Sequence, residues 1–141
     1  MRDECQALAR VHARVSNVIS GYDEAARRGA SRSVRLASAT ADLHRRHRRG
    51  LDGMLASRGC EPSPDGSFMA LVQEGAIRLR DWVDDLDEDL PARIRRTEER
   101  VLGFYDEAID ALRDSGPERA ALVVQRGELA AHLARIERRA A

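Results

Sequence analysis

The sequence predicts an all-α fold, a four-helix bundle, and three observations point to it. Several long stretches carry apolar residues at alternating steps of three and four, the spacing that lines one face of an α-helix. Glycines and prolines stand between these stretches, where helices end and begin. Apolar and polar residues nowhere alternate with period two over enough positions to predict a strand. We place this bundle in one domain that spans residues 1–141.

The first two helices are predicted at 3–28 and 32–58, and residues 29–31 separate them. The first helix has its apolar stripe at Leu8, Val11, Val15, Val18 and Tyr22. The stripe of the second consists of Leu36, Leu43, Leu51 and Met54, with His47 on the same line. A turn this short joins antiparallel helices, so these two should form a hairpin.

Three more helices are predicted after a loop at 59–67 that is rich in glycine and proline: a shorter one at 68–87, then 91–114 and 117–139. Pro91 and Pro117 suit the first turn of a helix. The last two helices should form a second hairpin, in which facing residue numbers add up to about 230. The helix at 68–87 then serves as a crossover between the hairpins. This ferritin-like arrangement makes the second and fourth long stretches, 32–58 and 91–114, parallel.

Two glycines of the second hairpin, Gly103 and Gly127, should face each other at this register. Each costs about 1 kcal/mol relative to alanine inside a helix. Either the two backbones approach closely there, or the glycines are tolerated without a role.

Charge and cysteine content narrow the class of protein. Acidic and basic residues balance at 24 each, and no lysine is present. A nucleic-acid binder would need an excess of positive charge. No stretch approaches the ~20 apolar residues that span a bilayer, so we expect no membrane contact and a cytoplasmic location. Cys5 and Cys60 lack a neighbouring ligand cluster and are expected to be free thiols.

Glu98 is the unusual residue, because it falls on the apolar stripe of the helix at 91–114. That stripe consists of Ile94, Val101, Tyr105, Ala108 and Leu112. When positions at the same height along the bundle axis are matched between helices, Tyr22, Thr40 and His132 lie around Glu98. With Tyr105, these groups would form a buried hydrogen-bond network in which carboxylate, imidazole, phenol and hydroxyl satisfy one another. Alternatively, Glu98 lies at the edge of the stripe, beside solvent.

Metal binding is the other interpretation of this cluster. Ferritin-like di-iron sites use inward glutamates and Glu-x-x-His pairs, and this chain contains no Glu-x-x-His. The sequence therefore predicts no conventional di-iron centre. A degenerate iron or zinc site would use Glu98 and His132, with Glu24 or His47. A second group, formed by His12, His44 and His47 roughly 10 Å further along, is another candidate for zinc or nickel.

Several short motifs carry a resemblance to a known family. They are GYDEAA at 21–26, GSFM at 66–69, Trp82, TEERVLGFYDEAI at 97–109 and AAHLARI at 130–136. The chain resembles a bacterial family of ferritin-like four-helix-bundle proteins catalogued as a domain of unknown function. Asn17 stands where members often carry an acidic residue, and residues 78–81 replace the His-Arg pair common before the tryptophan.

These observations favour a non-enzymatic structural or protein-interaction module that binds a protein partner or a second copy of itself. No cofactor is expected for that function. The alternative is a degenerate ferritin-like metal-binding or redox protein that uses Glu98 and His132.

Overall fold

The computed structural model describes residues 2–28, 31–60, 90–113 and 116–140. Within these ranges the regular structure is helical: α1 (Arg2–Arg28), α2 (Ser31–Ser57), α4 (Leu90–Ala111) and α5 (Pro117–Ala140). The prediction of an all-α fold is confirmed, and the helix bounds lie within about three residues of those expected from the sequence. The helix predicted at 68–87 lies outside the described residues.

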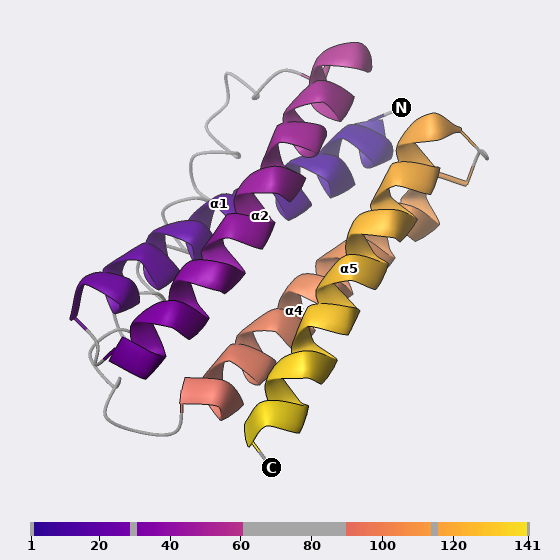
Figure 1. Cartoon of the computed structure of the whole chain (residues 1–141). Coiled ribbons are helices and arrows are strands. Elements are labelled where there is room, and N and C mark those ends of the chain that lie inside the picture. The colour runs from indigo at the N-terminus through magenta and orange to yellow at the C-terminus, as the bar shows by residue number, and fades with distance from the viewer. Residues whose placement is uncertain (1, 29–30, 61–89, 114–115, 141) are drawn as a thin grey trace.

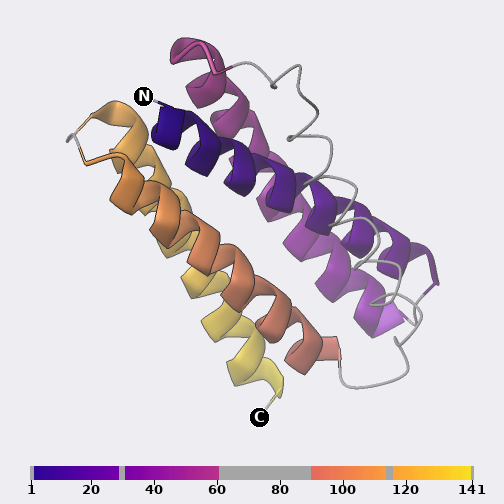
Figure 2. The same cartoon turned by 180° about the vertical axis from the view of Figure 1, so that it is seen from behind.

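The four helices are arranged as two antiparallel hairpins, α1 with α2 and α4 with α5 (Figure 1). Helices α2 and α4 run in the same direction, as predicted (Figure 1). Helix α1 packs on α2 and α4, and α5 packs on α4 and α2, so α2 and α4 lie across a diagonal. The pairing of α1 with α4 is visible from behind (Figure 2).

Each helix turns one apolar face inward, and these faces form the core of the bundle. The turn residues and prolines fix where each helix begins and ends, and the stripes then decide which face is buried. Leu36 is half-buried, whereas the other predicted apolar residues of α2 are buried. The largest fully buried aliphatic side chains are Leu8, Val11, Val15, Leu51, Ile94, Leu112, Leu122 and Leu129.

The second hairpin has the predicted register, since Tyr105 lies opposite Gln125 and Asp106 opposite Arg126. Gly103 and Gly127 nevertheless make no close approach. A Cβ built at either position meets no neighbouring atom within 4 Å. The close-packing explanation for these two glycines is therefore wrong.

Helix α2 ends in a Schellman motif built on Gly59. This glycine has a φ of 66° and donates its N–H to the carbonyl of Ala56, while the N–H of Cys60 bonds to the carbonyl of Leu55. The turn directs Cys60 toward the start of α1, where it forms a disulfide with Cys5. The expectation of free thiols is therefore wrong, because the hairpin brings the two cysteines to the same end of the molecule.

Candidate functional site

Glu98 lies in the centre of the bundle, and its side chain is 0% exposed. It projects from the inward face of α4 between Ile94 and Val101. The alternative that Glu98 stands at a solvent-exposed edge is thus excluded. A buried carboxylate is costly unless other groups bond to it, so the partners of Glu98 define the site.

Two residues from the first hairpin bond to Glu98. The phenol of Tyr22 on α1 donates to Oε1 across 2.5 Å. On α2, Nε2 of His44 lies 2.9 Å from Oε1 and 2.8 Å from Oε2. The tautomer of His44 that carries its hydrogen on Nε2 can donate to this carboxylate, as the phenol of Tyr22 does. The rings of Tyr22 and His44 are stacked, with centroids 6.3 Å apart and planes 6° from parallel.

A second set of polar contacts joins α5 to α2 and α4. The phenol of Tyr105 donates to Oε1 of Gln125 across 2.7 Å, and Nε2 of Gln125 donates to the carbonyl of His47 across 3.2 Å. Gly50 leaves room for this amide, because a Cβ there would lie 2.7 Å from Nε2 of Gln125. Both residues of the Tyr105–Gln125 pair are buried.

His132 on α5 bonds to Thr40 on α2 rather than to Glu98. Nε2 of His132 lies 2.9 Å from Oγ1 of Thr40. The same hydroxyl donates to the carbonyl of Leu36 across 2.9 Å. A hydroxyl has one hydrogen, so Thr40 accepts from His132. His132 thereby satisfies a buried threonine one turn away from the Glu98 cluster.

Burial keeps the neighbouring groups neutral. It raises the pKa of Tyr22 well above its ordinary value, and the negative charge of Glu98 adds to the effect. The pKa of Tyr105 is raised for the same two reasons. Burial, with the charge of His44, lowers the pKa of His47 to about 4. Burial also lowers the pKa of His132, helped by Arg135.

The four residues predicted as metal ligands contact different partners. Glu24 bonds to Arg27 on the surface of α1, and His132 bonds to Thr40. Nε2 of His47 lies 3.7 Å from Oε2 of Glu128. Across the described ranges, no three His, Cys, Asp or Glu side chains lie where they could share one ion.

His44 is the site residue that the sequence reasoning placed elsewhere. The sequence predicts His44 in a group with His12 and His47, away from Glu98, because the predicted alignment of the two hairpins places Thr40 at the level of Glu98. No local signal in the sequence identifies it, because the level of His44 emerges only in the folded hairpin, where its ring stacks on that of Tyr22. His12 instead bonds to Asp52, with 2.5 Å between Nε2 and Oδ1.

Fold and site together define an all-α four-helix-bundle protein whose buried acid is held by groups from the opposite hairpin. The chain belongs to the family described as domain of unknown function DUF2383, whose model matches residues 3–111. The match covers α1, α2 and α4, and the motif at 130–136 lies outside it. No curated protein and no solved structure matches the chain. None of the described helices is long and apolar enough to cross a membrane.

Proposed function

We propose that this chain is a non-enzymatic structural and protein-interaction module. The observation that supports the structural part is the bonding of Glu98. One of its oxygens accepts from Tyr22 and both lie within hydrogen-bond distance of His44. An acid whose oxygens are occupied by the chain's own groups in the core acts as a polar link between helices. Here it links the first hairpin to the second.

The outer face of α5 supports the interaction part. Val123 and Val124 are 46% and 59% exposed, and they are the large hydrophobic residues most exposed among those described. Small residues extend this face along the helix at steps of three and four. The exposed positions are Ala120, Gly127, Ala131 and Ala134.

The partner that this face fits is a second copy of the chain. A two-fold axis at Gly127 would pair two α5 helices in antiparallel orientation. Val123 would then lie opposite Ala131 of the second copy, and Val124 opposite Ala130. Large residues would meet small ones, and the glycine would allow the helices to approach closely. Self-association of this kind needs no further component.

Light scattering tests the interaction. We expect a mass of twice 15.7 kDa for the chain, and a mass of 15.7 kDa for Val124→Arg. Ser20→Arg is the matched control, because it places the same charge at an exposed position on α1. A monomeric parent protein at high concentration would contradict self-association. A dimer that survives Val124→Arg would place the interface elsewhere.

A second candidate function, metal binding, is favoured by His47. Both of its ring nitrogens, and Nδ1 of His44, are buried without a hydrogen-bond partner in the described part of the chain. Such nitrogens are the ones that an ion or an ordered water satisfies. Glu128 is the nearest carboxylate to His47. Iron or zinc could bind there, whereas a site on Glu98 and His132 would require Glu98 to give up a bond to Tyr22 or His44.

Elemental analysis separates the two candidates. The protein is purified without a histidine tag or chelator and then offered iron and zinc. The structural proposal expects no stoichiometric metal. A bound metal that disappears in His47→Ala but remains in Ser20→Ala would establish the second candidate. A metal that disappears in Glu98→Ala and His132→Ala would locate it at the Glu98–His132 pair that the sequence predicts.

A further inference from the structure

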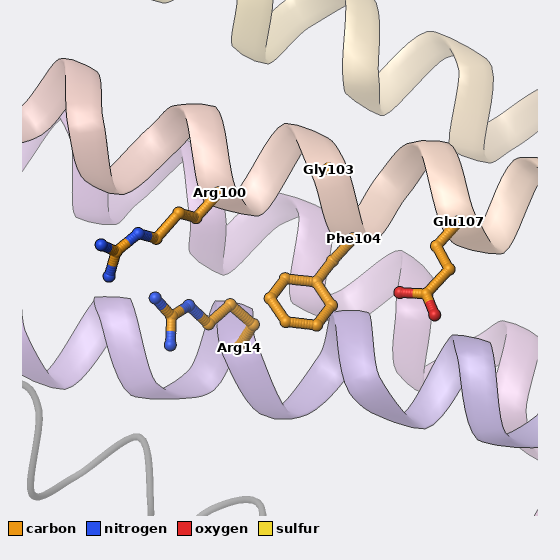
Figure 3. Close-up of a pocket in the computed structure, with 5 residues that line it drawn as sticks. All are labelled: Arg14, Arg100, Gly103, Phe104 and Glu107. Atoms are coloured by element: carbon orange, nitrogen blue, oxygen red, sulfur yellow. The ribbon is translucent and has the colours of Figure 1, made fainter.

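Two features of the molecule lie outside its buried core. One is a groove between α1 and α4, lined by Arg14, Arg100, Gly103, Phe104 and Glu107 (Figure 3). Two of its charged side chains have partners inside the chain, because Arg14 lies over the Phe104 ring and Glu107 is in an ion pair. The other feature is the disulfide between Cys5 and Cys60, a kind of bond that thiols can break and reform.

The disulfide lies at the end of the bundle where α1 begins and α2 ends (Figure 1). Both cysteines are half-buried, so a small thiol has access to this end of the hairpin. The buried core begins two residues further along α1, at Ala7 and Leu8, and on α2 it includes Met54. Breaking the bond therefore leaves the packing of the two helices in place. Accessible disulfides of this kind are the ones that open and close in folded proteins.

The two sulfurs differ in how well each holds a negative charge. Cys5 is the fourth residue of α1, among the N–H groups that form the positive end of the helix dipole. Cys60 follows the end of α2, and its Sγ lies 4.0 Å from the carbonyl oxygen of Arg58. A carbonyl favours the neutral thiol, which can donate to it, over the thiolate. Cys5 is therefore the better leaving group, because the sulfur that stabilises the charge leaves faster.

Arg58 supports this difference through an ion pair. Asp3 and Glu4 precede Cys5 in the first turn of α1, and their charges oppose a thiolate there. Arg58 pairs with Glu4, and its Nε also lies 3.7 Å from Oε1 of Glu118 on α5. The carboxylate next to Cys5 in the chain is thus compensated. Asp3 is exposed, so water weakens the effect of its charge.

We propose that the Cys5–Cys60 disulfide is a reversible redox site, which a dithiol reduces by attacking Cys60 with Cys5 as the leaving group. The bundle stays folded in both redox states, and the change is confined to the end where α1 begins and α2 ends. This inference does not depend on the proposed self-association through α5.

The reaction has two exchange steps. A thiolate of the dithiol forms an S–S bond with Cys60, the bond between the two cysteines breaks, and its electron pair leaves on Cys5, which takes a proton from water. The second thiol of the reductant then gives its proton to water and attacks the reductant's own sulfur in the mixed disulfide. The reductant closes its own disulfide, and Cys60 leaves as a thiolate and is protonated. Two electrons pass from the dithiol to the cysteines.

A monothiol stops the reaction after its first step, and 2-mercaptoethanol is the probe because it is small and neutral. The folded, oxidised protein is mixed with it briefly and acidified, and mass spectrometry of peptides locates the adduct. We expect about threefold or more adduct on Cys60 than on Cys5. In Arg58→Gln this excess should shrink, because Glu4 is left without its partner beside Cys5. Arg126→Gln is the matched control, since it removes a surface ion pair of the second hairpin and should keep the excess.

Dithiothreitol tests whether the site opens and closes in the folded protein. Without denaturant, it should convert the disulfide to two thiols while the helical signal in circular dichroism is kept. Oxidised glutathione should then restore the bond. Reduction only in urea would overturn the proposal, because the bond would then be a staple that the folded state protects. Loss of the helical signal on reduction would overturn it too, as would an adduct that forms equally on both cysteines or mainly on Cys5.

Discussion

The phenol oxygen of Tyr22 lies 2.5 Å from the carboxylate of Glu98, although 76 residues separate them in the sequence. Tyr22 belongs to the first hairpin and Glu98 to the second, so this hydrogen bond joins the two halves of the bundle. Both side chains are almost fully buried. Because water cannot replace the bond, its loss should reduce stability more than the loss of a surface contact would.

Tyr22→Phe should lower the free energy of unfolding by about 1.5–3 kcal/mol, the range for a hydrogen bond to a charged group. Urea denaturation measures it. Tyr105→Phe is the matched control, because its buried hydroxyl donates to the neutral amide of Gln125 and should cost about 1 kcal/mol. Combining Tyr22→Phe with Glu98→Gln should cost less than the two single losses added together. Strict additivity would show that the contact contributes nothing of its own.

Acid should destabilise the protein through His47. Its pKa falls from 6.5 to about 4 on folding, because burial and the charge of His44 oppose protonation. Between these values the unfolded chain holds the proton and the folded chain does not. The contribution of His47 to the free energy of unfolding is therefore full above pH 6.5 and falls as the pH drops toward 4. Below pH 4 this contribution falls no further. The loss is at most about 1.4 kcal/mol per pH unit.

The comparison of the protein with His47→Gln isolates this effect. Urea denaturation at pH 7 and pH 4.5, with a chelator present, gives the loss of stability for each. Other carboxylates and histidines titrate in both proteins, so their contributions cancel in the difference. The variant should lose less stability than the parent. If the two lose equally, the protonation of His47 is not coupled to folding.

The fold was predictable because its signals are local. Pro91, Pro117 and the residues at 29–31 mark helix ends, and the apolar stripes indicate the buried faces. A tight turn also fixes the register of its own hairpin. For this reason the sequence predicts that Tyr105 and Gln125 lie opposite each other, as they do in the structure. These features depend on neighbouring residues and on helix geometry alone.

The composition of the site was less predictable because it depends on how the two hairpins are aligned. No short turn fixes that alignment, since residues 61–89 connect them. An error of one helical turn, about 5.4 Å, exchanges Thr40 for His44 at the level of Glu98. The disulfide was missed for a related reason. A separation of 55 residues carries no signal until Cys5 and Cys60 are placed at the same end of one hairpin.

Reduction of the Cys5–Cys60 disulfide should destabilise the first hairpin. The bond closes a loop of 55 residues, and a loop of that length restricts the unfolded chain by roughly 4 kcal/mol. Urea denaturation with and without dithiothreitol measures the difference. The double variant Cys5→Ala and Cys60→Ala is the control, and its midpoint should not respond to the reductant. Two free thiols in protein that was never exposed to reductant would contradict the bond, and would agree with the cytoplasmic location, which stays a prediction.

Two glycines of α2 should respond to alanine in opposite ways. Gly53 has open space around it, so Gly53→Ala should stabilise the protein by about 0.5–1 kcal/mol through helix propensity. At Gly50 the same methyl would meet the amide of Gln125, which bonds to the carbonyl of His47 and accepts from Tyr105. In Gly50→Ala this collision should therefore cancel at least the stabilisation that alanine brings to a helix. If the amide is displaced, the free energy of unfolding should fall by about 1 kcal/mol more.

Thermal denaturation of Gly50→Ala, Gly53→Ala and the parent protein measures these changes in stability. A third variant, Gly50→Ala with Gln125→Ala, removes the collision. It should regain the helical contribution of the alanine relative to Gln125→Ala alone. If Gly50→Ala stabilises the protein as much as Gly53→Ala does, the amide of Gln125 moves aside at no cost. The contact of α5 with α2 at His47 would then contribute nothing to holding the two hairpins together.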